Sequence, residues 1–198
     1  MSDILSSLQK DKNLILYHTS FDIIKEPDIK RGRPNADFAQ GFYLSDNEDF
    51  SKRWARNRKD MTSYLNKYSL NIEGLKIKTF TRDIEWYDYI YSNRNGKKDY
   101  LSEYDIIIGP IANDTLYDTL GVLTSGFFKK EQALEVYKIG KQYNQIVIKT
   151  QKALNGLKFE EAKAFDKEEI AKYQEFRKQE EQDFQTQFAR IVGEMNKK

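Results

Sequence analysis

The sequence has no cysteine, one histidine and three prolines among its 198 residues. Without cysteine there are no disulfide bonds, no thiolate nucleophile and no cysteine metal centre, and a single histidine argues against a zinc site. No apolar run is long enough to span a bilayer, and the N-terminus lacks the basic and apolar segments of a signal peptide. We therefore expect a cytoplasmic protein with no metal and no membrane partner.

An excess of one charge sign is also missing, since 33 Lys and Arg face 31 Asp and Glu for a net charge of +2 at pH 7. This total implies neither nucleic acid nor membrane as a partner, although a local basic patch is compatible with it. Charged residues still make up 32% of the chain, so part of it is expected to lie outside the core. The 13 tyrosines and 12 phenylalanines argue against general disorder, because such residues build cores or stacking platforms.

Two short predicted strands carry the residues best suited to chemistry. Residues 14–17 form an apolar strand that ends at His18, the only histidine. Residues 42–44 form a second strand of β-favouring types, between Gly41 and Ser45. We expect Gly41 to adopt backbone angles that are closed to other residues, and the segment from Ser45 onward to begin a helix.

The rest of the chain alternates between short strands and helices, which predicts an α+β fold. Strands are expected at 64–72, 75–80, 104–111 and 144–150, the third being the most apolar and therefore central, and the fourth the last strand. Helices are expected at 3–10, 48–58, 85–92 and 128–142, with helix or turn at 114–123. Residues 21–35 contain Gly and two prolines and are expected to form a loop that is well placed to cover a ligand. The dinucleotide fingerprint and the Walker sequence are both absent.

The character of the chain changes at Asp166. Asp166 and Glu169 have the spacing of a capping box, and a long charged helix with scattered apolar residues is expected to follow. We predict one domain at residues 1–165 and a charged C-terminal helix at 166–198. This helix either packs back along the domain or binds a partner, and its stripe of Phe184, Phe188 and Ile191 indicates such a contact rather than a ligand site.

Three motifs resemble, in order, those of the ADP-ribosyltransferase superfamily, in the branch that includes diphtheria toxin and the poly(ADP-ribose) polymerases. The first is Tyr-His-Thr-Ser at residues 17–20. The second is Ala-Gln-Gly-Phe-Tyr-Leu-Ser-Asp at 39–46, which resembles the polymerase sequence Gly-Lys-Gly-Ile-Tyr-Phe-Ala-Asp. The third is Tyr-Asn-Gln-Ile-Val at 143–147, which resembles Asn-Glu-Tyr-Ile-Val. With Asp-Ile-Ile-Ile-Gly-Pro-Ile-Ala-Asn-Asp at 105–114, the chain also resembles an uncharacterised bacterial family placed beside these transferases. The resemblance implies split mixed or antiparallel sheets.

The resemblance also implies that the matched residues bind NAD as a co-substrate. His18 would hydrogen-bond the ribose that carries nicotinamide, and the backbone beside Thr19 would hold the nicotinamide amide. Tyr43 would stack on the nicotinamide ring, and Ser45 would support the floor of the site next to Gly41. For His18 taken alone, a structural histidine satisfied by a backbone carbonyl is the simpler interpretation.

A loop over the dinucleotide would contain Asp37 and Phe38, which also read as a simple turn with an aromatic plug. From charge and position we place Arg31 or Arg33 near the phosphates. The cations of residues 48–58 read instead as a solvated helix face, in preference to a phosphate-binding patch.

The chain departs from the family at Gln145, where the resemblance places a glutamate. Cleavage of the nicotinamide–ribose bond passes through an oxocarbenium-like state that a carboxylate stabilises. Gln145 can orient the ribose but is neutral. Three acids are candidates to replace the charge: Glu103, Asp105 and Asp114. Otherwise the acceptor needs less activation, or the fold binds its ligand without catalysis.

Two functions follow from the resemblance. The first is an NAD-dependent ADP-ribosyltransferase that modifies a macromolecular acceptor, protein or nucleic acid, as an intracellular toxin of a toxin–antitoxin or anti-phage defence system. An antitoxin or another partner would then bind the C-terminal helix. The alternative is a catalytically inactive binding module that acts through protein partners. An unrelated α+β domain with chance matches conflicts with the preserved order of the motifs.

Overall fold

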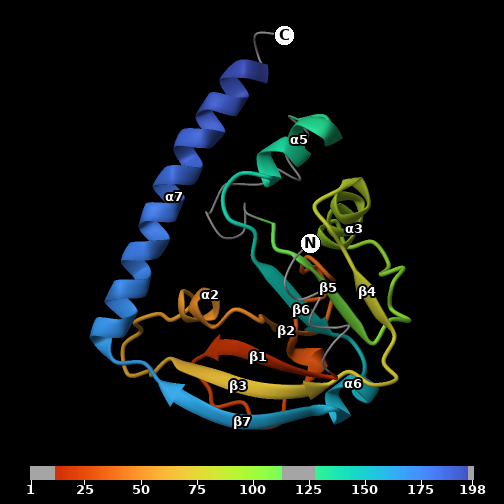
Figure 1. Cartoon of the computed structure of the whole chain (residues 1–198), viewed down its shortest axis with the longest axis vertical. Helices are drawn as coiled ribbons and strands as arrows, with labels where there is room; N and C mark the ends of the chain where they lie inside the picture. The colour runs from red at the N-terminus through yellow and green to blue at the C-terminus, as the bar shows by residue number, and fades with distance from the viewer. Residues whose placement is uncertain (1–11, 113–127, 196–198) are drawn as a thin grey trace.

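The computed structural model describes residues 12–112 and 128–195, and Figure 1 shows how their helices and strands are arranged. Two sheets form the centre of the molecule. One has three strands in the order β1-β3-β7, and the other has four strands in the order β2-β6-β5-β4. The predicted α+β class with a C-terminal helix is confirmed.

The three-stranded sheet is antiparallel throughout. Its strands are β1 (Asn13–Ser20), β3 (Tyr64–Asn71) and β7 (Leu157–Ala164). Because β1 is longer than predicted, His18 lies within the strand and not after its end. The prediction that residues 144–150 form the last strand is wrong, since β7 follows them. None of the residues of β7 is buried, so this charged edge strand lacks the apolar alternation that marks other strands.

The four-stranded sheet supplies the buried centre. Its strands are β2 (Phe42–Leu44), β6 (Asn144–Ile148), β5 (Ile106–Pro110) and β4 (Ile77–Thr79). β5 is parallel to β4, whereas β6 is antiparallel to both of its neighbours. Every residue of β5 is buried, and the strand lies inside the sheet, as its apolar sequence predicts. A single bridge between Tyr17 and Ser45 joins β1 to the chain that leaves β2.

Several predicted helices are shorter in the structure. The helices of the domain are α2 (Glu48–Lys52), α3 (Ile84–Arg94), α5 (Lys130–Tyr137) and α6 (Gln151–Asn155), with a short 3-10 helix, η1 (Ile29–Arg31), in the predicted loop. The expectations of helix over 48–58 and 128–142 are therefore wrong at their C-terminal ends. After α2, the backbone N–H groups up to that of Ala55 bond to the carbonyl three residues earlier, as in a 3-10 helix. Beyond them, Ser63 Oγ accepts from the N–H of Arg56 and donates to its C=O, so the helix does not continue. The expected segments 3–10 and 114–123 lie outside the described residues.

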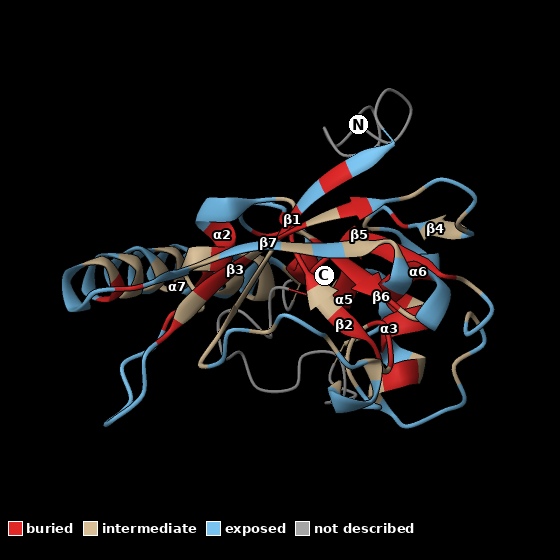
Figure 2. Ribbon diagram, turned by 90° about the horizontal axis from the view of Figure 1, so that it is seen from below, coloured by how far each residue is buried: buried red, intermediate tan, exposed pale blue. Residues whose placement is uncertain are grey.

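The two sheets pack face to face, and helices cover the far side of the four-stranded sheet. One apolar cluster joins Leu16 and Tyr68 of the three-stranded sheet to Ile106 and Ile148 of the other. Ile107 points to the opposite face of β5 and belongs to a second cluster, which contains residues of α3 and α5. Figure 2 shows this distribution as buried residues along β5 and β6 and exposed residues along β7.

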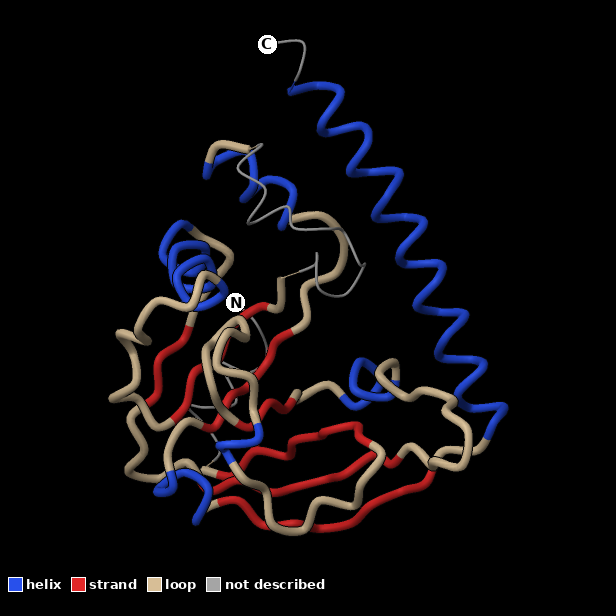
Figure 3. Tube along the Cα trace, turned by 180° about the vertical axis from the view of Figure 1, so that it is seen from behind, coloured by secondary structure: helices blue, strands red, loops and turns tan. Residues whose placement is uncertain are grey.

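The C-terminal helix, α7 (Lys167–Met195), packs back along the domain. The predicted capping box is present, because Glu169 N–H donates to Asp166 Oδ1 at 2.8 Å and Asp166 N–H donates to Glu169 Oε2 at 3.3 Å. From there α7 runs past α2 toward α5 (Figures 1 and 3). Phe184 is 1% exposed and belongs to the apolar cluster that contains Ile107 and residues of α3 and α5. Phe188 and Ile191 pack against this cluster. Of all the helices in residues 12–112 and 128–195, not one has both the length and the apolarity needed to cross a membrane.

Candidate functional site

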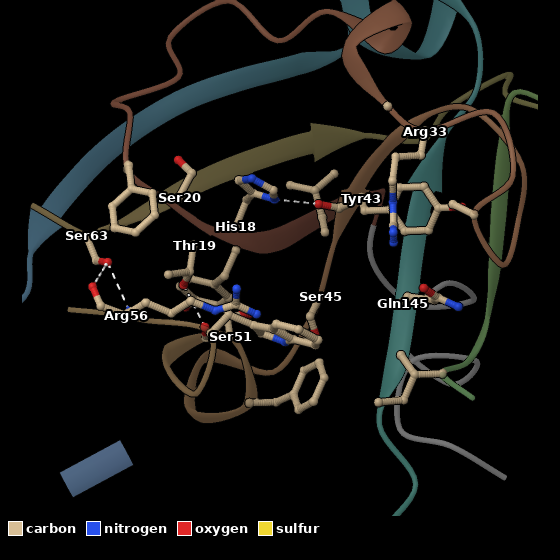
Figure 4. A pocket seen from close by; sticks show the side chains of 18 of the residues that line it. His18, Thr19, Ser20, Arg33, Tyr43, Ser45, Ser51, Arg56, Ser63 and Gln145 are labelled. Atoms are coloured by element: carbon tan, nitrogen blue, oxygen red, sulfur yellow. Dashed lines mark hydrogen bonds between the residues drawn. The ribbon is translucent and has the colours of Figure 1, made fainter. Parts of the chain in front are cut away.

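A pocket of about 700 Å³ lies where β1 and β2 diverge. Its wall comes from the end of β1, the loop at 31–37, β2, the region of α2 and one residue of β6 (Figure 4). Eight of the ten predicted site residues line it: His18, Thr19, Arg31, Arg33, Asp37, Tyr43, Ser45 and Gln145. The fold therefore brings together residues of motifs that lie far apart in the sequence.

His18 is held by the strand opposite. Its ring atom Nδ1 lies 2.8 Å from the carbonyl oxygen of Tyr43. A carbonyl only accepts, so Nδ1 carries the proton, and in the neutral ring Nε2 is then an acceptor. Burial lowers the pKa of His18 below its ordinary value of 6.5, which keeps the ring neutral near neutral pH. His18 thus has the backbone partner of a structural histidine and also offers an acceptor to a ligand in the pocket.

Thr19 provides backbone groups at the edge of the pocket. In an antiparallel strand, alternate residues direct their N–H and C=O groups to opposite sides. Tyr17 uses both groups to pair with Ser45, at 2.8 and 3.0 Å, and β1 and β2 diverge beyond this bridge. Thr19 lies two residues later, so its N–H and C=O are on the same edge. Its hydroxyl donates to the carbonyl of Ser51 at 2.6 Å and ties this part of β1 to α2.

Tyr43 uses its hydroxyl to shape the loop before β2. The oxygen accepts from Phe38 N–H at 2.9 Å and donates to the carbonyl of Ala39 at 2.7 Å. Ala39 has a positive φ of 59°, a conformation that costs energy in a residue with a Cβ. Burial, aided by the charge of Asp37, raises the pKa of Tyr43 well above its ordinary value of 10.0. The phenol therefore stays neutral, and its ring is what it contributes to the pocket (Figure 4).

Gln145 lies beside a carboxylate. It pairs with Gly109 of β5 and is 8% exposed. Its Nε2 donates to Oδ2 of Asp37 at 3.3 Å. The other oxygen of Asp37, Oδ1, accepts from Nε of Arg94 at 2.8 Å and from Nη2 at 2.7 Å. The neutral amide of Gln145 and the paired charge of Asp37 thus form one hydrogen-bonded group at the pocket wall.

Ser45 and Gly41 hold β2 in place. The Ser45 hydroxyl donates to the carbonyl of Asn144 at 3.0 Å and accepts from Asn47 N–H at 3.2 Å. Gly41 does not line the pocket, and its φ is not in the left-handed region, so the expectation of special backbone angles is wrong. A Cβ at Gly41 would lie 2.5 Å from Cγ1 of Val147. Glycine is therefore required by the close approach of β2 to β6.

Three arginines line the pocket, namely Arg31, Arg33 and Arg56, and all three are exposed. Among the described residues, no carboxylate forms a salt bridge with any of them. Figure 4 places Arg33 beside the ring of Tyr43. The interpretation of Arg56 as part of a solvated helix face is wrong, because α2 ends at Lys52 and Arg56 turns toward the pocket. These three positive charges make the pocket suited to an anionic ligand.

Phe38 does not cover the pocket. Its side chain is 0% exposed and packs against Phe80 and Tyr89, with ring centroids 5.8 and 5.9 Å away. The expectation that Phe38 lies over a dinucleotide is therefore wrong, and the alternative of an aromatic plug is correct. Its neighbour Asp37 does face the pocket.

Two of the three acids expected to replace a missing glutamate, Asp105 and Glu103, are described by the structure and lie away from the pocket. Asp105 precedes Ile106 at the opposite end of β5 from Gly109, and its carboxylate accepts from Thr150 Oγ1 at 2.6 Å and Lys76 N–H at 2.8 Å. Glu103 forms an exposed ion pair with Lys76 at 2.9 Å. Neither of them lines the pocket. Asp114 lies outside the described residues.

Two aromatic residues of the pocket wall were missed by sequence reasoning. Phe50 and Trp54 line the pocket, but their helical spacing reads as ordinary core packing. Phe50 stacks on Tyr143 with ring centroids 4.4 Å apart. From the other side, α7 supports this wall, because Glu180 pairs with Arg53 and accepts from the Tyr143 hydroxyl at 3.0 Å.

The described residues form an α+β protein with a pocket between two diverging strands. The chain belongs to the family described as "Protein of unknown function (DUF3990)", whose profile matches residues 14–159. This match includes both sheets up to Phe159 and ends before α7. No curated protein and no solved structure matches the chain.

Proposed function

We propose that the protein is an NAD-dependent ADP-ribosyltransferase. The observation that carries the proposal is the grouping of His18, the Thr19 backbone and the ring of Tyr43 in one pocket. Residues from all three sequence motifs that resemble ADP-ribosyltransferases line this pocket. The family match itself carries no function, so the proposal depends on the pocket and on the motifs.

In this proposal, three parts of NAD have binding partners among the pocket residues: the nicotinamide, the ribose that carries it and the two phosphates. The nicotinamide ring stacks on Tyr43, and its carboxamide, with one acceptor and one donor group, pairs with the N–H and C=O of Thr19. A ribose hydroxyl donates to Nε2 of neutral His18. The two phosphates are bound by Arg31 and Arg33, which line the pocket without a salt bridge to any described carboxylate.

The reaction is a substitution at the ribose C1′ atom. The bond between C1′ and the nicotinamide nitrogen breaks, and its electron pair stays with nicotinamide, which leaves as a neutral molecule. A nucleophile of the acceptor, or water, forms a new bond to C1′ and releases its proton to solvent. Nothing is oxidised or reduced. His18 and Tyr43 hold the substrate, and neither needs to transfer a proton.

The experiment is to incubate the untagged protein with NAD and to measure nicotinamide release by chromatography and NAD binding by calorimetry. Two variants, His18→Ala and Tyr43→Ala, are expected to lose release when they are compared with the wild type at equal folded fraction, taken from thermal melts. Tyr91→Ala, which removes a tyrosine that is 38% exposed outside the pocket, serves as the matched control and should behave like the wild type. If the wild type neither binds NAD nor releases nicotinamide, the proposal fails.

The acceptor is proposed to be a macromolecule, as expected for an intracellular toxin or defence effector. NAD labelled in its adenine ring, added with the protein to a cell lysate, reports the acceptor class. Label that disappears on protease treatment identifies a protein acceptor, and label that disappears on nuclease treatment identifies a nucleic acid. Failure to label either would count against a macromolecular acceptor.

A second function is favoured by one observation, the neutral side chain of Gln145 at the position where the resemblance implies a glutamate. It is a binding module without catalysis, which acts through protein partners. That function predicts NAD binding, or none, without nicotinamide release, and partner capture that survives both His18→Ala and Tyr43→Ala. Loss of release in these two variants excludes it.

A further inference from the structure

Only two acids line the pocket within the described residues, and they differ in setting. Asp22 is exposed in the loop after β1. The side chain of Asp37 is 12% exposed and forms the hydrogen bond to Gln145. Among the described acids of the pocket, Asp37 is therefore the one whose carboxylate is held in place by hydrogen bonds and is largely shielded from water.

The loop around Asp37 is held rigidly. The backbone carbonyl of Asp37 accepts from Asn93 Nδ2 at 2.9 Å. The next carbonyl, that of Phe38, accepts at 2.5 Å from Lys149 Nζ, a buried ammonium that also pairs with Asp99 at 2.7 Å. These contacts, with the two hydrogen bonds of the Tyr43 hydroxyl, fix the position of the carboxylate before any ligand enters. Such preorganisation is what makes a fixed charge effective in stabilising a transition state.

The two oxygens of the Asp37 carboxylate have different partners. Oδ1 faces Arg94, and Oδ2 faces Gln145. Arg94 gives the sheltered carboxylate an ion-pair partner, which matters because a buried charge without a partner is costly. The negative end of this ion pair is thus turned to the amide of Gln145. Since Nε2 of Gln145 donates to Asp37, Oε1 is the amide atom left to accept from a ligand.

We propose that Asp37 supplies, next to Gln145, the negative charge that stabilises the positive ribose during cleavage of the nicotinamide bond. Gln145 Oε1 accepts from a ribose hydroxyl, and Asp37 orients the amide and places its charge behind it. Two residues thus divide the roles of orientation and charge. The inference rests on the proposed function. Asp37 is a positioning and electrostatic residue, and it forms no covalent bond.

The test removes the negative charge from position 37 and then restores it at position 145. Asp37→Asn is expected to lower kcat for nicotinamide release by about 10²–10³, the size of effect seen when one preorganised electrostatic contact to a transition state is lost. The dissociation constant for NAD should change little, because the charge acts mainly on the transition state. The double variant Asp37→Asn/Gln145→Glu should recover most of the lost kcat, because the carboxylate returns one side chain away.

The single variant Gln145→Glu should bring no gain, since it adds a second carboxylate beside one that already acts. The matched control is Asp88→Asn, which removes a surface aspartate that pairs with Lys130 and has a side chain 42% exposed. It should leave kcat unchanged. All variants are compared at equal folded fraction, from thermal melts.

Each outcome decides the inference. If Asp37 had a purely structural role, activity would fall in Asp37→Asn and would not recover in the double variant. That result would overturn the inference. Unchanged kcat in Asp37→Asn overturns it, as does a gain of 10² or more in Gln145→Glu alone, which would mean that the native site lacks the charge. A wild type that binds NAD but releases no nicotinamide on prolonged incubation also overturns it. A wild type without binding or release overturns the proposed function itself, and this inference with it.

Discussion

The ring nitrogen Nδ1 of His18 and the carbonyl oxygen of Tyr43 are 2.8 Å apart, across the point where β1 and β2 diverge. This contact joins a residue of each sheet and fixes the proton of the ring on Nδ1. The same two residues supply the acceptor and the aromatic ring of the proposed nicotinamide site. The relative position of these two groups is thus set by the contact between the two sheets.

The state of His18 leads to a prediction about pH. Burial lowers the pKa of His18 below 6.5, so the unfolded chain binds a proton more readily than the folded protein does. The free energy of unfolding should therefore be highest above pH 6.5 and decrease as pH falls from 6.5 to the pKa of the folded state. Because the chain has one histidine, NMR titration of the untagged protein reports that pKa from a single imidazole.

The control for this prediction is His18→Gln, which cannot titrate in this range. Other groups titrate in both proteins, so the difference in unfolding free energy between wild type and variant isolates the histidine. That difference should change with pH below 6.5 and be constant above it. An NMR pKa above 6.5 would contradict the burial-dominated setting described above.

Tyr43→Phe separates the ring from the hydroxyl. The variant keeps the aromatic surface for stacking but leaves Phe38 N–H and the Ala39 carbonyl without their partner. We expect a loss of about 1–3 kcal/mol in the free energy of unfolding, measured by urea denaturation. NAD affinity, measured by calorimetry, should fall much less than in Tyr43→Ala. Equal affinities in the two variants would show that the ring is not what binds the ligand.

Apolar runs such as β5 are local signals, so they predict the strands of the buried sheet. The resemblance to ADP-ribosyltransferases, and not these runs, implies that the three motifs meet. The sequence does not predict where α2 ends, since the end depends on Ser63 binding the backbone of Arg56. The end of α2 decides whether Arg56 belongs to a solvated helix or to the pocket. β7 is missed for a related reason, because its strand character comes from pairing with β3 and not from its own composition.

The candidate site shows the same limit. The difference between Asp37 and Phe38, one at the pocket and the other in the core, depends on aromatic partners distant in the sequence. The pairing of Asp37 with Arg94 spans 57 positions, and no local pattern indicates it. Motif positions can therefore be predicted from the sequence, whereas the charges that surround them cannot.

Gly41 provides a prediction about packing. In Gly41→Ala the new Cβ would lie 2.5 Å from Val147 Cγ1 and 2.7 Å from the carbonyl oxygen of Ile148, so β2 must move away from β6. We expect a loss of about 1–3 kcal/mol in unfolding free energy. Gly193→Ala is the matched control, because no heavy atom lies near its Cβ position in α7 and alanine favours the helix by up to about 1 kcal/mol. Equal effects of the two substitutions in urea denaturation would contradict the close approach of the strands.

The packing of α7 is tested by two phenylalanines of the same helix. Phe184 is 1% exposed within the cluster that covers the four-stranded sheet, whereas Phe176 is 49% exposed. Phe184→Ala should lower the unfolding free energy by about 3–5 kcal/mol, because it leaves a cavity in that cluster. Phe176→Ala should change it by no more than about 0.5 kcal/mol. Urea denaturation of the full chain measures both, and tryptophan fluorescence reports the wall that α7 supports, since Arg177 lies over Trp54 at 5.9 Å. If the two variants are equally stable, α7 does not contribute to the domain and is a separate helix available to partners.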